Sequence, residues 1–124
     1  AGTADKVELC RRLGAAIAVN YREQDFEAEL RGTGIDVILD MVGAPYFSKN
    51  LSLLNDLGRL CFIAFLQGAE VERADLSRIM MKRLTVTGST LRIRTDAYKA
   101  ALAAAVERHV WPWIEEGRVR PIVQ

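Results

Sequence analysis

Four short apolar runs divide the chain at regular intervals and predict β-strands. They cover residues 15–20, 35–43, 60–66 and 84–88. The run at 35–43 reads IDVILDMVG, which is typical of a buried parallel strand whose carboxyl end meets a ligand at a glycine turn. The run at 84–88 alternates apolar and hydroxyl side chains, which predicts an edge strand or a strand with one exposed face.

Amphipathic segments separate these strands and predict helices. The expected helices cover residues 5–13, 26–31, 46–57, 75–82 and 96–110. Gly14 and Gly58 are plausible stops for two of them, and Thr95 or Asp96 can cap the last. Pro112 predicts a kink or a new helix start. The alternation of helices and strands is typical of an α/β fold with a parallel sheet.

Composition narrows the class of protein. The chain has 124 residues, half of them hydrophobic, which is the size of one ordinary domain. Lys and Arg number 17 against 16 Asp and Glu, so no bulk charge favours nucleic acid or a membrane surface as partner. Cys10 and Cys61 stand among apolar neighbours, which favours buried free thiols over a disulfide and indicates a cytoplasmic location.

Few residues invite catalytic or metal chemistry. His109 is the single histidine, and its position late in an alanine-rich helix favours a structural or surface role, because a cation there complements the helix dipole. Two separated cysteines and one histidine supply too few zinc ligands. No nucleophile, base and orienting residue form a triad. The sequence therefore predicts neither a metal site nor a catalytic residue within the chain.

The carboxyl end of the strand at 35–43 is the first candidate binding site. Val42 and Gly43 lie where ligands bind in an open α/β sheet, and glycine would let the backbone approach a ligand without an intervening side chain. Asp40 either hydrogen-bonds backbone amides near this turn or faces the cleft, and we favour the structural role because a buried carboxylate needs partners.

Six phrases of the chain carry a family resemblance. They are AGTADK, LGAAIAVNYREQDF, GIDVILDMVGAPYF, LNDLGRLCFIAFLQG, MKRLTVTGSTLRIR and IEEGRVRPIV. In this order they resemble the cofactor domain of medium-chain dehydrogenases/reductases, within them the zinc-independent quinone oxidoreductase branch. The resemblance implies a Rossmann-like parallel sheet flanked by helices, NADP(H) as cofactor, and hydride transfer to a small-molecule quinone or α,β-unsaturated carbonyl in a parent protein.

The resemblance also implies cofactor contacts. Gly2 matches the end of the second strand, and no carboxylate follows it directly, which points to NADPH, with Thr3 offering a hydroxyl and Lys6 a charge to the phosphate. From the residues alone, Thr3 would instead cap a helix and Lys6 would be solvated. Tyr21 matches an aromatic residue beside the adenosine ribose, and Arg22 is a weaker second charge. The contacts implied around the nicotinamide, beyond Val42 and Gly43, are Ile63, Ala64, Phe65, Ser89, Thr90 and Leu91.

The chain departs from the family at its beginning. In that family a strand, a glycine-rich turn and a substrate domain come before AGTADK, and this sequence contains none of them. We therefore expect residues 1–124 to be a partial nucleotide-binding domain with an incomplete sheet, a fragment that is inactive alone. The absent first strand would leave the strands at 15–20 and 35–43 without neighbours, so we expect re-paired strands or a homo-oligomer. The strand at 84–88 resembles an edge that pairs across a dimer.

Two further functions remain open at this stage. An enoyl reductase module of an acyl-chain or polyketide synthase shares these phrases. A non-catalytic NADPH-binding or sensor module would need the same cofactor contacts without turnover.

Overall fold

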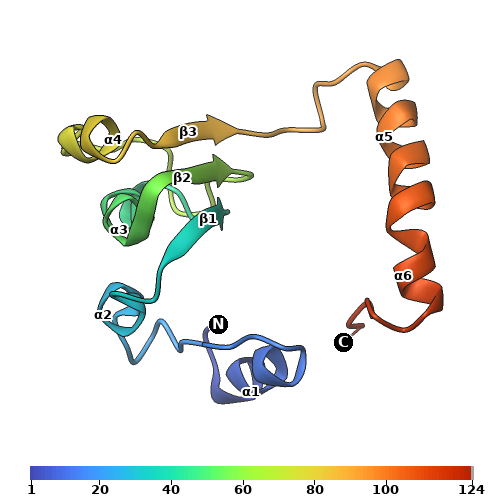
Figure 1. The fold of residues 1–124 in the computed structure, drawn as a ribbon, viewed down its shortest axis with the longest axis horizontal. Helices are drawn as coiled ribbons and strands as arrows, with labels where there is room; N and C mark the ends of the chain where they lie inside the picture. The colour runs from blue at the N-terminus through green and yellow to red at the C-terminus, as the bar shows by residue number, and fades with distance from the viewer. Residues whose placement is uncertain (124) are drawn as a thin grey trace. The chain divides into compact units, whose positions relative to one another are not determined.

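Three parallel strands form the sheet of this protein. The computed structural model describes residues 1–123, which divide into two compact units, Ala1–Ser89 and the residues from Thr90 onward. The sheet lies in the first unit in the order β1-β2-β3, made of Ile35–Asp40, Leu54–Phe62 and Thr85–Gly88 (Figure 1). The predicted edge position of the last strand is confirmed within this sheet.

Helices connect the strands, as parallel neighbours require. A short 3-10 turn, η1 (Ala44–Tyr46), and helix α3 (Phe47–Leu53) lead from β1 to β2, and α4 (Ser77–Met81) precedes β3. The predicted α/β class, a parallel sheet with flanking helices, is confirmed.

Two more helices begin the first unit at predicted positions. Helix α1 (Ala4–Arg12) starts after Thr3, whose hydroxyl accepts a hydrogen bond from the Lys6 N–H. Helix α2 (Phe26–Leu30) starts after Asp25, whose carboxylate accepts from Glu27 N–H. Both are side-chain N-caps, which satisfy backbone donors that a helix start leaves unpaired.

The core lies between the sheet and the helices on one of its faces. Its buried members are leucines, and Ile38 of β1, Phe62 of β2 and Ile79 of α4 pack against them. The buried leucines are Leu51, Leu54, Leu60 and Leu84. The periodicity of two along a strand then leaves Val37 and Leu39 on the other face, where they are 54% and 64% exposed.

The region between α3 and β2 corrects the sequence prediction. Helix α3 ends at Leu53 rather than at 57, and β2 begins at Leu54 and ends at Phe62 rather than at 66. The ammonium of Lys82 explains the early stop, because it donates hydrogen bonds to the carbonyls of Leu51, Ser52 and Leu54 at 3.3, 2.9 and 2.6 Å. A residue so distant in sequence leaves no local signal at the helix end.

The predicted strand at 15–20 is also wrong in the structure. Within the described chain, residues 15–20 belong to no strand. Only one ladder step is formed: the Ala1 amino group donates to Val19 O at 2.8 Å, and Tyr21 N–H donates to Ala1 O at 3.0 Å. A strand needs a neighbour along its length, and within the described residues the ladder-like hydrogen bonds of this segment are those made with Ala1.

The strand at β1 is less buried than its sequence predicts. In the described residues it pairs with β2 alone, and no helix covers Val37 or Leu39, so its second edge and second face are open. The segment at 15–20 does not pair with it, so the rearranged strand pairing that we considered is absent from this structure.

The second unit contains two helices that follow the sequence prediction. Helix α5 (Asp96–His109) is capped by the Thr95 hydroxyl, and α6 (Trp111–Glu115) starts anew with Pro112 in its first turn. No helix in the described part of the chain is long and apolar enough to cross a membrane.

Candidate functional site

The start of helix α1 brings together the first group of predicted residues. A Cβ atom built on Gly2 would lie 2.9 Å from the Tyr21 hydroxyl oxygen and 3.3 Å from Arg22 Nε. The two hydrogen bonds of Ala1 fix this approach. Gly2, Tyr21 and Arg22 therefore form a polar corner, in which the absence of a Cβ lets the Tyr21 and Arg22 side chains pack against the backbone of Gly2.

A buried asparagine shapes the turn that presents this corner. Asn20 is 6% exposed, and its side-chain oxygen accepts a hydrogen bond from the Arg22 N–H at 3.3 Å. Its backbone carbonyl accepts from Glu23 and Gln24. The turn leaves Tyr21 47% exposed.

Thr3 and Lys6 occupy the first turn of α1. The Thr3 hydroxyl caps the helix at 3.4 Å from Lys6 N, so the structural role expected from the residues alone is present. Lys6 is exposed. A cation in a first turn opposes the helix dipole unless an anion lies nearby, and backbone N–H groups at a helix start favour such an anion.

Asp40 organises the second group, at the carboxyl end of β1. One oxygen of its carboxylate accepts hydrogen bonds from Val42 N–H at 2.6 Å and Gly43 N–H at 3.3 Å, and the other accepts from Asn50 Nδ2 at 2.8 Å. Asp40 is 4% exposed and Asn50 3%. The structural role predicted for Asp40 is confirmed.

The loop after β2 is bonded to this turn. Leu66 N–H donates to Met41 O at 3.0 Å, Gln67 N–H to Val42 O at 2.9 Å, and Ala44 N–H to Gly68 O at 2.9 Å. Val42 and Gly43 are therefore brought beside the segment that carries Ile63, Ala64 and Phe65.

The backbone conformation and the packing of the loop after β2 both require glycine at position 43. Its φ is +98°, and an added Cβ would come closer than 3.0 Å to the Gly68 carbonyl oxygen and lie 2.9 Å from Phe65 Cδ1. The sequence prediction gave ligand approach as the reason for this glycine. In the structure the neighbouring space holds the loop after β2.

The edge of the sheet presents an apolar surface. Ile63 is 40% and Phe65 51% exposed, whereas Ala64 is half-buried. Ser89 joins them, since its N–H donates to Phe62 O at 2.8 Å. The structure thus groups four of the predicted nicotinamide contacts with Val42 and Gly43, while Thr90 and Leu91 belong to the second unit.

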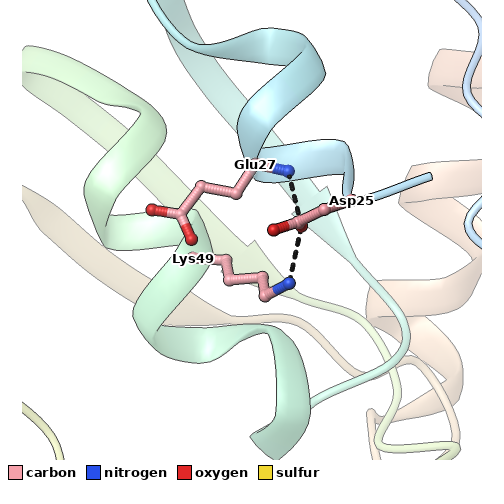
Figure 2. Close-up of polar contacts among 3 residues, drawn as sticks. All are labelled: Asp25, Glu27 and Lys49. Carbon is pink, nitrogen blue, oxygen red and sulfur yellow. Dashed lines mark hydrogen bonds and ion pairs between the residues drawn. The ribbon is translucent and has the colours of Figure 1, made fainter.

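An ion pair links α2 and α3 on the same unit. Lys49 Nζ lies 2.6 Å from Asp25 Oδ1 and 5.3 Å from the centre of the Phe26 ring, and the same carboxylate oxygen caps α2 (Figure 2). The hydrogen bond from Lys49 lowers the pKa of Asp25, and the same bond raises the pKa of Lys49. This pair joins two helices and does not reach either group of candidate residues.

A cavity of about 330 Å³ adjoins Tyr21. Tyr46 and Phe26 line it with ring centres 4.5 Å apart, and burial raises the pKa of Tyr46. Its remaining lining is mostly apolar: Ala1, Cys10, Ala15, Ile17, Ala18, Val19 and Leu30.

Metal-ligand residues are dispersed. Within residues 1–123, no three His, Cys, Asp or Glu side chains form a group that could hold a metal ion. Cys10 and Cys61 are free thiols, as predicted, and both are half-buried.

Sequence reasoning missed Asn50. The available signal was a short amide side chain between Lys49 and Leu51 in a helix with a buried face, where an unpaired polar group is costly.

Comparison with known proteins agrees with this geometry. The family model described as zinc-binding dehydrogenase matches residues 1–107. Human quinone oxidoreductase is 30% identical over 115 residues, which cover 86% of this chain and 34% of the human protein. A 2-haloacrylate reductase from a Burkholderia species is 37% identical over 60 residues, 45% of this chain and 18% of that protein. The chain thus spans about a third or less of these relatives.

One solved structure is similar to nearly all of this chain. The crystal structure of Escherichia coli quinone oxidoreductase complexed with NADPH superposes with a TM-score of 0.77 at 26% identity, covering 99% of this chain and 38% of that one. The parallel sheet and the turns at its carboxyl edge therefore define a Rossmann-like α/β protein. With its family match over most of its length, the chain belongs to the zinc-binding dehydrogenase family. The predicted resemblance to medium-chain dehydrogenases/reductases is confirmed.

Proposed function

We propose that residues 1–124 are part of the nucleotide-binding domain of a longer, NADPH-dependent oxidoreductase that transfers hydride to a quinone or an α,β-unsaturated carbonyl. The observation that carries this proposal is the polar corner of Gly2, Tyr21 and Arg22 at the start of α1, in a chain of a dehydrogenase family. The printed names of the relatives, a quinone oxidoreductase and a 2-haloacrylate reductase, support the two classes of acceptor.

The polar corner would hold the phosphate on the adenosine ribose. Because Gly2 has no Cβ, the Tyr21 hydroxyl and the Arg22 guanidinium lie close to the backbone at the start of α1, where both would face the phosphate. Lys6 and the Thr3 hydroxyl, in the adjoining helix turn, would add a charge and a polar contact. Two cations beside a helix start favour a doubly charged phosphate over the neutral ribose hydroxyl of NAD.

The apolar edge would hold the nicotinamide. When bound, the cofactor supplies the hydride. Val42, Ile63, Ala64 and Phe65 would offer the flat wall and fixed backbone groups that such a ring needs, and Gly43 would let the loop that carries Phe65 pack against the turn. We assign Ser89, Thr90 and Leu91 to the same ring from the family resemblance.

Calorimetric titration of the 124-residue chain with NADPH and NADH tests the proposal. We expect tighter binding of NADPH, weakened about tenfold by Arg22→Ala or Lys6→Ala, because a hydrogen bond to a charged group is worth roughly 1.5–3 kcal/mol. NADH binding should not change. Arg12→Ala, at the opposite end of α1, is the matched control. Equal affinity for the two nucleotides would refute the cofactor assignment.

We propose further that the isolated chain is inactive and that turnover belongs to the longer cytoplasmic protein. Oxidation of NADPH that depends on added quinone or enone, measured on that longer protein, separates an oxidoreductase from a non-catalytic sensor. The open edge and exposed face of β1 support association of the isolated chain into a homo-oligomer, since unpaired strand edges attract partners.

A further inference from the structure

Asn50 is buried on helix α3, and its side chain donates a hydrogen bond to Asp40 at the end of β1. It is 3% exposed, lies beside the core residue Leu51, and its side-chain nitrogen donates to Asp40 Oδ2 at 2.8 Å. A buried amide without a partner costs free energy. Here the partner is the Asp40 carboxylate at the end of β1.

That carboxylate divides its two oxygens between helix and turn. Oδ2 receives the Asn50 amide, and Oδ1 receives the backbone N–H groups of Val42 and Gly43 at 2.6 and 3.3 Å. A carboxylate is planar and rigid, so fixing one oxygen fixes the direction of the other. The helix thereby determines where the two amides of the turn lie.

The turn transmits this position to the neighbouring loop. Met41 O and Val42 O accept hydrogen bonds from Leu66 and Gln67, and Asp40 O accepts from Ile63 N–H at 2.8 Å. Residues 63–67 are thus bonded to the turn at three points. A shift of the Asp40 side chain would displace both walls of the apolar edge.

We infer that Asn50 is a positioning residue for the cofactor-facing turn, acting through Asp40. The assignment of the turn to the nicotinamide rests on the proposed function. Without the Asn50 amide, Oδ2 would be a buried acceptor lacking its donor, and the carboxylate would rotate toward water and release Val42 N–H and Gly43 N–H.

The chain offers a matched control at the other end of the same strand. Asn55 Nδ2 donates to Asp36 Oδ1 at 2.8 Å, but this pair is exposed. Asn50→Leu and Asn55→Leu therefore break the same kind of hydrogen bond at the same length, and only the first reaches the turn. A third variant, Asp40→Asn with Asn50→Asp, exchanges the partners and restores one amide–carboxylate pair in reverse.

Amide hydrogen exchange of the 124-residue chain, followed residue by residue by NMR, measures the position of the turn without cofactor. We expect Asn50→Leu to accelerate exchange at Val42 and Gly43 about tenfold or more, Asn55→Leu to leave both within about twofold of wild type, and the exchanged pair to recover most of the loss. If Asn50→Leu unfolds the sheet, exchange becomes faster throughout β1 and β2. In that case the exchange rates of Val42 and Gly43 in the double variant with exchanged partners, compared with wild type, test the inference.

Equal exchange at Val42 and Gly43 in the Asn50→Leu and Asn55→Leu chains would overturn the inference, as would an exchanged pair that recovers nothing. Titration with NADPH is the second measurement, and we expect weaker binding for Asn50→Leu alone. A wild-type chain that binds NADPH no more tightly than NADH would refute the proposed function, whereas the exchange rates would still decide whether Asn50 positions the turn.

Discussion

Replacement of Gly43 by alanine should destabilise the first unit severely, and Gly68 provides the control. Both glycines have positive φ, +98° and +104°. An alanine at Gly68 would meet nothing within 4 Å, whereas the Cβ of an alanine at Gly43 would lie closer than 3.0 Å to the Gly68 carbonyl oxygen and to a carbon of Phe65. Both substitutions place alanine at a positive φ, and only the one at Gly43 also brings the new Cβ into collision with its neighbours.

The expected magnitudes follow from these two effects. A non-glycine residue in such a conformation costs about 1–3 kcal/mol, and this is the whole expected loss for Gly68→Ala. At Gly43 the obstructing oxygen belongs to backbone and accepts the hydrogen bond from Ala44, so relief of the collision breaks that bond and shifts the loop, which adds about 2 kcal/mol or more. The sum is a large part of the roughly 5–15 kcal/mol that stabilises a domain.

Urea denaturation followed by far-ultraviolet circular dichroism measures both losses. We expect the midpoint of Gly43→Ala to fall well below that of Gly68→Ala at similar slope. Losses that agree within about 0.5 kcal/mol would show that the loop after β2 does not press against Gly43, and the reasoning about this turn would fail.

Three other predictions concern stability and association. The pKa of Asp25 is lowered and that of Lys49 is raised, so the wild-type chain should be more stable than Lys49→Met at neutral pH. Denaturation at a series of pH values should show this advantage disappear in acid, as the pH falls through the lowered Asp25 pKa, below 3.8. It should also disappear in alkali, as the pH rises through the raised Lys49 pKa, above 10.5. Lys82→Met should lower the free energy of unfolding, measured by thermal denaturation, by about 2 kcal/mol, because the carbonyls at the end of α3 lose their donor. The neighbouring Arg83 is exposed, and an equal loss for Arg83→Met would contradict this. Sedimentation velocity should show association of the wild-type chain and more monomer for Val37→Lys, and an unchanged distribution would exclude the open face of β1 as the contact.

Local signals predicted most of the fold. The cap at Thr95, the restart at Pro112 and the apolar strand at 35–43 each reflect side chains that act on their own backbone or on a whole sheet face. The errors arose where distant residues decide. The end of α3 depends on Lys82, and the failure of residues 15–20 to form a strand reflects the pairing of Ala1 alone with that segment.

The candidate site was predictable only in part for the same reason. Gly2 and Tyr21 could be paired from the family resemblance, and the structure brings them together. The link from Asn50 to the turn could not be derived from spacing, because an amide on α3 gives no indication of which carboxylate it meets. The packing of Gly43 against the loop after β2 could not be predicted either, since the carbonyl that an added Cβ would meet belongs to Gly68, 25 positions later in the sequence.

The attachment of Lys82 to the end of α3 has a consequence for synthesis on the ribosome. The helix is complete in sequence at Leu53, yet three carbonyls at its end gain their shared donor only when a residue some thirty positions later has left the exit tunnel. A nascent chain paused before that point would carry α3 with a frayed terminus, open to water and to chaperones. The end of α3 would therefore become fully hydrogen-bonded only after Lys82 has emerged.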